Sequence, residues 1–251
     1  MALTGLAAAE DAVDKCWAPF VKGRYWLYEG TVKYVKEDEV KGNEVKEQHI
    51  TRWKSEVIDT FEGKDFKVAL LKGFPFELAW YQEDKPRRDV IVWLSNDGKF
   101  SVIRNEKNLV GRFAQIKATS KFPEDLADAG EVSFNSALRA RDLKDDGLAI
   151  RYEWIVDNVW NAPFEPAVKG LPAAAEYKTI HLWYRGTPEH AFLEFVVGVG
   201  ITAYTYVHHG TKGDCEVKLV ETGITQPAKP IPPAHRSTPT KGEQAAARRP
   251  E

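Results

Sequence analysis

The stretch that decides the fold is Tyr177–Glu221, which reads YKTIHLWYRGTPEHAFLEFVVGVGITAYTYVHHGTKGDCEVKLVE. It contains four runs rich in aromatic and β-branched residues, which favour strands. The short connections between the runs hold Gly186, Gly198, Gly200, Gly210 and Gly213. Such runs predict an antiparallel meander with strands at Tyr177–Tyr184, His190–Val197, Ile201–His209 and Cys215–Glu221.

Symmetric turns between these strands would fix which side chains share a face, because side chains alternate along a strand. One predicted face is apolar and forms a core: Ile180, Leu182, Leu193, Phe195, Ala203, Val207, Val217 and Leu219. The opposite face is mixed: His181, Trp183, Phe192, Glu194, Tyr204, Tyr206, His208 and Lys218. In this register His181, Glu194 and Tyr204 are lateral neighbours, and the next row holds Trp183, Phe192 and Tyr206.

The sheet is predicted to continue upstream. The opening run Arg24–Val35 alternates so that one face carries Trp26, Tyr28, Val32 and Tyr34, with Gly30 between them. Asn96-Asp-Gly98 predicts a hairpin turn between two of the remaining strands. Those strands are expected at Gln48–Phe61, Phe66–Lys72, Phe76–Tyr81, Asp89–Ser95, Lys99–Arg104 and Leu148–Val156.

The middle and the ends of the chain differ from the sheet. Short helices are predicted at Pro123–Leu126 and Asn135–Arg141, within Glu106–Asp145, and a further helix at Ala2–Lys15. Residues 222–251 hold six of the fourteen prolines and predict a disordered tail. We therefore expect an N-terminal helical lead (1–15), one domain (16–221) and the tail. The predicted fold class is α+β: a strongly curved, half-barrel-like antiparallel sheet whose concave face is covered by a few short helices.

Composition excludes several classes of protein. The chain has 251 residues, with 35 Lys+Arg against 37 Asp+Glu and a formal net charge of -2. This balance argues against a nucleic-acid binder, which needs a concentrated basic surface. No apolar run approaches the roughly 18 residues of a membrane span. Met1–Lys15 lacks the basic and apolar regions of a secretory signal, so a literal interpretation of the start predicts a cytoplasmic protein.

Motifs of known chemistry are missing from the sequence. It contains no G-x-S-x-G, S-x-x-K, H-E-x-x-H or glycine-rich phosphate loop. The two cysteines, Cys16 and Cys215, are compatible with one disulfide or with two buried thiols. His208 and His209 point to opposite faces of a strand, and one of them beside His190 and Glu216 would hold at most an adventitious ion. We predict no metal site and no cofactor.

Two groups of side chains remain open to two interpretations each. His181, Glu194 and Tyr204 offer an imidazole, a carboxylate and a phenol for an acid–base site, or a hydrogen-bonded patch such as sheets often carry. The aromatic rows either line an apolar pocket or form a second core. These rows are Trp183, Phe192 and Tyr206, and Trp26, Tyr28 and Tyr34.

Two sequence motifs, one near each end of the predicted domain, resemble the same group of proteins. The opening Cys16-Trp-Ala-Pro-Phe-Val-Lys-Gly-Arg-Tyr-Trp-Leu-Tyr-Glu-Gly-Thr-Val and the closing Gly198-Val-Gly-Ile resemble bacterial exported or lipoprotein-like β-sheet proteins of unassigned function. The resemblance covers roughly residues 16–35 and 190–221. It implies a place in the cell envelope or periplasm, a lipidated cysteine where Cys16 stands, and a sheet like the half-barrel of lipoprotein carriers. No lipobox precedes Cys16 in this sequence.

Together these observations predict a non-catalytic binding protein with an aromatic-lined cavity for an apolar or amphipathic small molecule. The predicted ligand-binding residues are Trp26, Tyr28, His181, Trp183, Phe192, Glu194, Tyr204 and Tyr206. One alternative is an enzyme with His181 as base, oriented by Glu194, and Tyr204 as acid. Another is a structural protein that meets a partner in the cell envelope. The sequence sets no oligomeric state.

Overall fold

The structure is a computed structural model of the chain and describes residues 20–36, 44–81, 85–135, 143, 151–165, 167–173, 175–186, 188–209 and 213–225. The predicted helices at Ala2–Lys15 and, beyond Asn135, at 136–141 lie outside these ranges, as do Cys16 and residues 226–251 of the predicted tail. Within the described part of the chain, no helix is long and apolar enough to cross a membrane.

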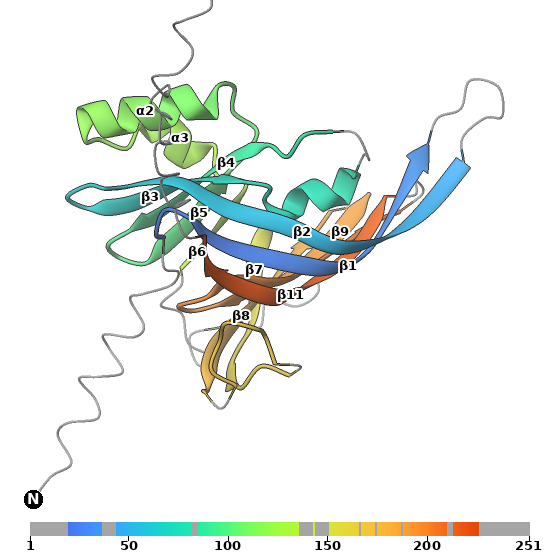
Figure 1. Cartoon of the computed structure of the whole chain (residues 1–251). Coiled ribbons are helices and arrows are strands. Elements are labelled where there is room, and N and C mark those ends of the chain that lie inside the picture. The colour runs from blue at the N-terminus through green and yellow to red at the C-terminus, as the bar shows by residue number, and fades with distance from the viewer. Residues whose placement is uncertain are drawn as a thin grey trace, which may run out of the picture.

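Eleven strands of the described residues form one antiparallel sheet (Figure 1). The strand order is β6-β5-β4-β3-β2-β1-β11-β10-β9-β8-β7, so the first and last strands of the described residues are neighbours. Their bounds are β1 Arg24–Lys36, β2 Glu44–Glu62, β3 Phe66–Lys72, β4 Asp89–Ser95, β5 Lys99–Ile103, β6 Val132–Asn135, β7 Arg151–Ala162, β8 Tyr177–Arg185, β9 Glu189–Val196, β10 Gly200–His208 and β11 Asp214–Ile224.

The sheet curls until its two ends face each other and nearly close. The Phe195 ring on β9 lies 5.2 Å from Phe100 on β5 and 5.2 Å from Phe134 on β6, measured between ring centroids. These strands stand far apart in the strand order, so the contacts cross the interior. The inner face therefore encloses the main core, and the predicted α+β class with a strongly curved antiparallel sheet is confirmed.

A short 3-10 helix, η1 (Pro75–Trp80), lies inside this curve (Figure 1). The predicted strand at Phe76–Tyr81 is thus wrong. Proline has no N–H for a strand ladder but fits the first turn of a helix, so Pro75 starts η1. Phe76 and Leu78 are 1% and 0% exposed, and Phe76 stacks on Trp154 of β7 with ring centroids 5.5 Å apart. The helix that covers the concave face is therefore η1.

Helices α2 (Leu109–Thr119) and α3 (Glu124–Asp128) pack on the outer face instead. The expectation that helices from Glu106–Asp145 cover the concave face is wrong for these two. Strands β3 to β5 are apolar on both faces, and their outward side chains need cover as well. A second buried cluster joins strands to helices there: Phe66, Val68, Leu70, Ile91, Ile103, Leu109, Phe113, Ile116 and Leu126.

Local turn chemistry accounts for much of the strand pattern. The Asn96-Asp-Gly98 hairpin is confirmed: Gly98 has φ of +90° and its N–H donates to Ser95 O at 3.0 Å. The predicted bounds Phe66–Lys72 and Asp89–Ser95 match β3 and β4. The meander of β8 to β11 is also confirmed. Strand β11 continues to Ile224, three residues into the predicted tail.

Candidate functional site

The predicted row of His181, Glu194 and Tyr204 is not formed. His181 of β8 does pair with Glu194 of β9, but the residue of β10 that pairs with Glu194 is Ala203. A bulge causes the difference, because Ile201 pairs with Phe195 and leaves Thr202 as an extra residue. Every later side chain of β10 changes face. An acid–base site that needs the three groups on one face is therefore not assembled here.

The bulge sends Tyr204 and Tyr206 to the inner face, beside Trp26 and Tyr28. All four are buried. The polar tips of two are satisfied by the backbone: Trp26 Nε1 donates to Val199 O at 2.7 Å and Tyr28 OH to Ile201 O at 2.9 Å. Burial raises the pKa of both Tyr28 and Tyr204 above the usual phenol range. The cavity beside Trp26 and Tyr28 has only about 20 Å³, so these aromatic side chains form packed core.

The other predicted residues, His181, Trp183, Phe192 and Glu194, lie on the outer face. The three aromatic rings of this group stack in a row: the centroids of Trp183 and Phe192 are 5.8 Å apart, and those of Phe192 and His181 are 5.6 Å apart. His181 Nδ1 lies 3.0 Å from Asp157 Oδ2. The structure thus divides the predicted ligand-binding set between the two faces of the sheet.

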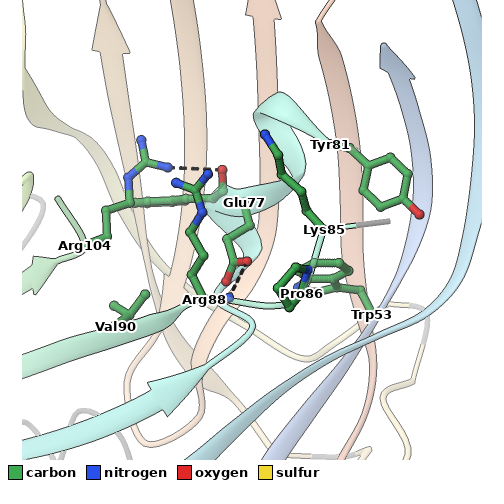
Figure 2. A pocket seen from close by; sticks show the side chains of 9 residues that line it. Trp53, Glu77, Tyr81, Lys85, Pro86, Arg88, Val90 and Arg104 are labelled. Atoms are coloured by element: carbon green, nitrogen blue, oxygen red, sulfur yellow. Dashed lines mark hydrogen bonds between the residues drawn. The ribbon is translucent and has the colours of Figure 1, made fainter. Parts of the chain in front are cut away.

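A different pocket opens where η1 meets the end of β4, and Figure 2 shows its side chains. This η1 pocket has a volume of about 70 Å³. Elements far apart in sequence supply its walls: β2, η1, the segment before β4, β4 itself and the residue after β5. The lining residues are Trp53, Phe76, Glu77, Tyr81, Lys85, Pro86, Arg88, Val90 and Arg104.

Glu77 is the unusual group of the η1 pocket. Its Oε2 accepts a hydrogen bond from the backbone N–H of Arg88 at 2.8 Å. Its Oε1 is buried and has no hydrogen-bond partner among the described residues. Desolvation raises the pKa of this carboxyl to about 7, against the opposing effect of the Arg88 N–H and the nearby arginines. A buried carboxyl that titrates near neutrality marks a candidate functional site.

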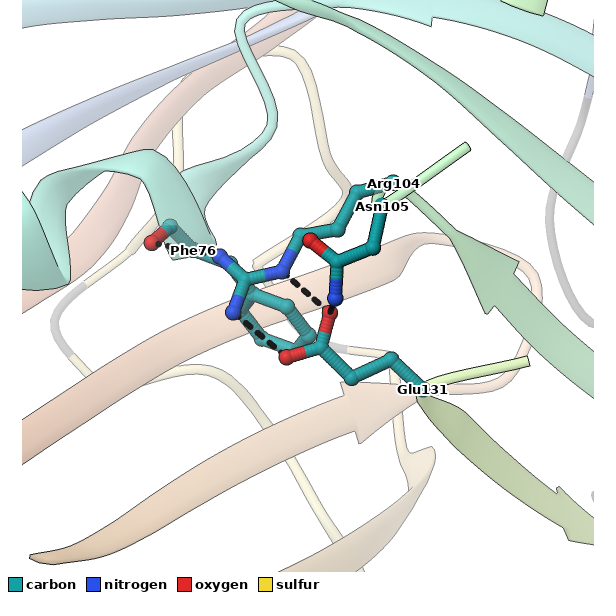
Figure 3. Close-up of polar contacts among 4 residues, drawn as sticks. All are labelled: Phe76, Arg104, Asn105 and Glu131. Atoms are coloured by element: carbon teal, nitrogen blue, oxygen red, sulfur yellow. Dashed lines mark hydrogen bonds and ion pairs between the residues drawn. The ribbon is translucent and has the colours of Figure 1, made fainter. Parts of the chain in front are cut away.

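Arg104 fixes the helix beside Glu77 (Figure 3). Its Nε and Nη2 pair with both carboxylate oxygens of Glu131. Its Nη1 donates to the carbonyl oxygen of Phe76 at 3.2 Å, and the guanidinium lies 5.5 Å from the centroid of the Phe76 ring. A bidentate pair of this kind holds both partners in one geometry. Arg104 therefore ties η1 to the strand ends, with its charge compensated by Glu131.

The aromatic wall of the pocket is also fixed. Trp53 Nε1 donates to Gly73 O at 2.8 Å, and the Tyr81 ring meets Trp53 edge to face with centroids 6.4 Å apart. Val90 is fully buried, whereas Lys85 and Pro86 are exposed at the mouth. The η1 pocket thus combines a rigid aromatic and apolar wall with three basic side chains and one buried acid.

Sequence reasoning missed this site. It places Glu77 in a strand and assigns no function to the charged segment 83–89. One signal was present: Glu77 is the single charged residue in the apolar run Phe74-Pro-Phe-Glu-Leu-Ala-Trp-Tyr81. A lone acid in such a run must be buried or turned outward, and Pro75 argues against the strand that would turn it outward.

No protein-family model matches the chain, and no curated protein matches it in sequence. Two solved structures are similar to it. One is a "putative lipoprotein" from Parabacteroides distasonis, with 10% identity and a TM-score of 0.43 over 83% of this chain and 99% of that one. The other is a "putative exported protein with YmcC-like fold" from Bacteroides fragilis, with 8% identity and a TM-score of 0.39 over the same shares. Both descriptions agree with the resemblance seen in the sequence.

Proposed function

We propose that this chain is a non-catalytic binding protein that holds the acidic head group of an amphipathic small molecule in the η1 pocket. The observation that carries the proposal is Glu77 Oε1, which is buried without a hydrogen-bond partner in the described part of the chain. An unpaired buried polar atom costs about 1–3 kcal/mol. A ligand that supplies the missing partner removes this cost.

The charges around the pocket favour an anion. Lys85 and Arg88 line it, Arg104 is already paired with Glu131, and Glu77 is the single acidic residue of the lining. Because burial raises the pKa of Glu77 to about 7, its carboxyl is mostly protonated at pH 6. The O–H of this neutral form donates a hydrogen bond to an anionic head group. Basic side chains with one neutral acid among them suit a carboxylate, which accepts hydrogen bonds from both kinds of donor.

The size of the pocket sets how much of the ligand it holds. A volume of about 70 Å³ is small beside the roughly 300–1,000 Å³ of ordinary small-molecule pockets, so the pocket suits a head group better than an alkyl chain. The chain of the ligand then lies at the mouth, over Trp53, Tyr81 and Pro86. Aromatic and apolar side chains at that place bury it from water.

Calorimetry with octanoate and 1-octanol tests this proposal, since the two share a chain and differ in the head group. We expect octanoate to bind about tenfold more tightly at pH 6, because a charge-assisted hydrogen bond contributes about 1.5–3 kcal/mol. Arg88→Gln and Lys85→Gln should each weaken octanoate binding. Lys107→Gln, at an exposed lysine outside the pocket, is the matched control. Equal affinity for octanol, or no effect of Arg88→Gln, would contradict the proposal.

Native mass spectrometry of the protein from its own host identifies the natural ligand. A small acid that is present in the native spectrum and lost on denaturation supports the η1 pocket, provided that Arg88→Gln reduces its occupancy. An unmodified protein without a ligand shifts the interpretation toward a protein that meets a partner in the envelope.

The motif resemblance supports a place in the cell envelope for this binding protein. Fractionation of the host tests that part, and the denatured mass shows whether Cys16 carries a lipid. Recovery of the protein only from the cytoplasm, without added mass, would exclude it.

A further inference from the structure

A second concave site lies on the outer face of the sheet, away from η1. This outer groove crosses the ends of β7, β8 and β9 and has a volume of about 460 Å³, within the usual range of about 300–1,000 Å³ for small-molecule sites. Its lining differs in character from the η1 pocket. The lining residues are Trp160, Ala162, Pro163, Phe164, Glu165, Thr179, Glu194 and Val196.

The register of the sheet explains the shape of the outer groove. Trp160 pairs with Thr179, and Thr179 with Val196, so these three side chains form one lateral row. Thr179 and Val196 are 6% and 1% exposed and form the floor. After β7 the chain turns back at Pro163, and the Phe164 ring packs on Tyr177 with centroids 4.7 Å apart. Trp160 and Phe164 are thus held as two aromatic walls over a small floor.

The charge of the outer groove has one sign. Glu165 and Glu194 line it, and no lysine or arginine does. Neither carboxylate has an ion-pair partner among the residues that the structure describes. His181 pairs across the strands with Glu194, but its ring nitrogen is directed to Asp157 at 3.0 Å. The Trp160 ring lies 6.2 Å from the His181 ring, measured between centroids.

We propose that the outer groove binds a small organic cation, of the quaternary or alkylammonium class. Two features of the lining point to the same ligand. Aromatic faces attract a cation within about 6 Å of the ring through the ring quadrupole, and two unpaired carboxylates supply the complementary charge. A neutral ligand of the same shape would gain contact with the rings but would leave the carboxylates unpaired. This site is independent of the η1 pocket, whose lining favours an anion.

Choline and 3,3-dimethylbutan-1-ol are the probes for this proposal, because the alcohol has the same shape with carbon in place of nitrogen. Binding of both is measured on the full chain by calorimetry and by ligand-observed NMR. We expect choline to bind saturably and the neutral alcohol about tenfold more weakly, as a desolvated cation–ring contact implies. Affinity for choline should also fall with added salt.

Variants locate the binding. Trp160→Leu and Glu194→Gln should each weaken choline binding several-fold, whereas Glu29→Gln, on an exposed part of β1, should leave it unchanged. Glu194→Gln keeps the size of the side chain, so it reports on charge even where Trp160→Leu perturbs folding. Equal affinity for the alcohol, absence of choline binding at millimolar concentration, or binding that Glu194→Gln leaves intact would each overturn the proposal.

Discussion

The interior of this sheet contains two aromatic regions that look alike in composition and differ in their polar groups. Around Trp26 and Tyr28 the indole N–H and the phenol O–H each donate to a backbone carbonyl. In the η1 pocket, aromatic side chains line the wall beside Glu77, and one oxygen of that carboxyl has no partner in the described part of the chain. The first region is complete by itself, whereas the second lacks one hydrogen-bonding group.

Whether the buried polar atoms have hydrogen-bond partners therefore distinguishes packed core from a candidate binding site better than aromatic content does. A satisfied aromatic side chain contributes buried area and stability. An unsatisfied buried acid reduces stability, and proteins keep such groups where a ligand or a reaction uses them. Four substitutions test whether the two regions differ in this way.

The largest effect is expected from Tyr28→Ala. Tyr28 is 2% exposed, and truncation of a buried aromatic side chain costs about 3–5 kcal/mol. Urea unfolding measures the loss, and Tyr25→Ala, at a half-buried tyrosine on the same strand, is the control with a smaller loss. A loss below about 1 kcal/mol would mean that the Trp26–Tyr28 region is loosely packed, and the contrast between the regions would disappear.

Glu77→Gln should change how stability depends on pH. The folded-state pKa of about 7 lies above the ordinary value of 4.5, so the folded protein binds this proton more tightly than the unfolded chain. Wild-type stability then falls as pH rises from about 4.5 to about 7, by about 3 kcal/mol. The variant lacks this fall and should be the more stable protein at pH 8, with little difference at pH 4.

Unfolding curves at pH 4, 6 and 8 check the prediction for Glu77. Glu62→Gln, at an exposed carboxylate, should leave the pH profile as it is. Parallel profiles of wild type and Glu77→Gln would show that Glu77 is an ordinary surface acid, and the central contrast would fail.

Arg104→Met should destabilise the protein by about 1–3 kcal/mol, because Glu131 and the carbonyl of Phe76 lose their partner at a site only a quarter exposed. The same variant should loosen η1, which faster hydrogen exchange of the amides of 76–80 would reveal. Unchanged exchange would mean that packing of Phe76 and Leu78 alone holds the helix.

Tyr28→Phe gives the smallest expected effect. It keeps the ring and removes the hydrogen bond to Ile201 O, which contributes about 1 kcal/mol. Thermal unfolding detects this difference. A stability equal to that of wild type would show that the carbonyl is satisfied without the phenol.

Much of the fold could be predicted from the sequence, because alternation and turn residues act locally. The strands β3 and β4, the hairpin at Gly98 and the inner face of Trp26, Tyr28 and Val32 follow from such signals. The bulge at Thr202 does not, since one extra residue leaves the composition of the strand unchanged while it exchanges the faces of Tyr204 and Tyr206. The predicted site failed at that residue.

The η1 pocket could not be found from local patterns for a different reason. Its walls come from residues between Trp53 and Arg104 that meet only because the sheet curls around η1. Proline at position 75 predicts an interruption of the strand, but nothing near Glu77 in sequence shows which strands will enclose it. The position of α2 and α3 on the outer face likewise could not be predicted from the helices alone, because it depends on strands that are apolar on both faces.

The pairing of β1 with β11 has a consequence for the order of assembly. Tyr25 on β1 lies opposite Gly223 on β11, so the middle of the sheet joins segments almost two hundred residues apart. Loop closure over such a distance is slow relative to local pairing. During synthesis β1 keeps one open edge until the last strand has emerged, and a chain that stops before Asp214 exposes both β1 and β10 as templates for aggregation. Strand β11, which follows the hairpins of β8 to β10, therefore decides whether the two halves of the sheet join.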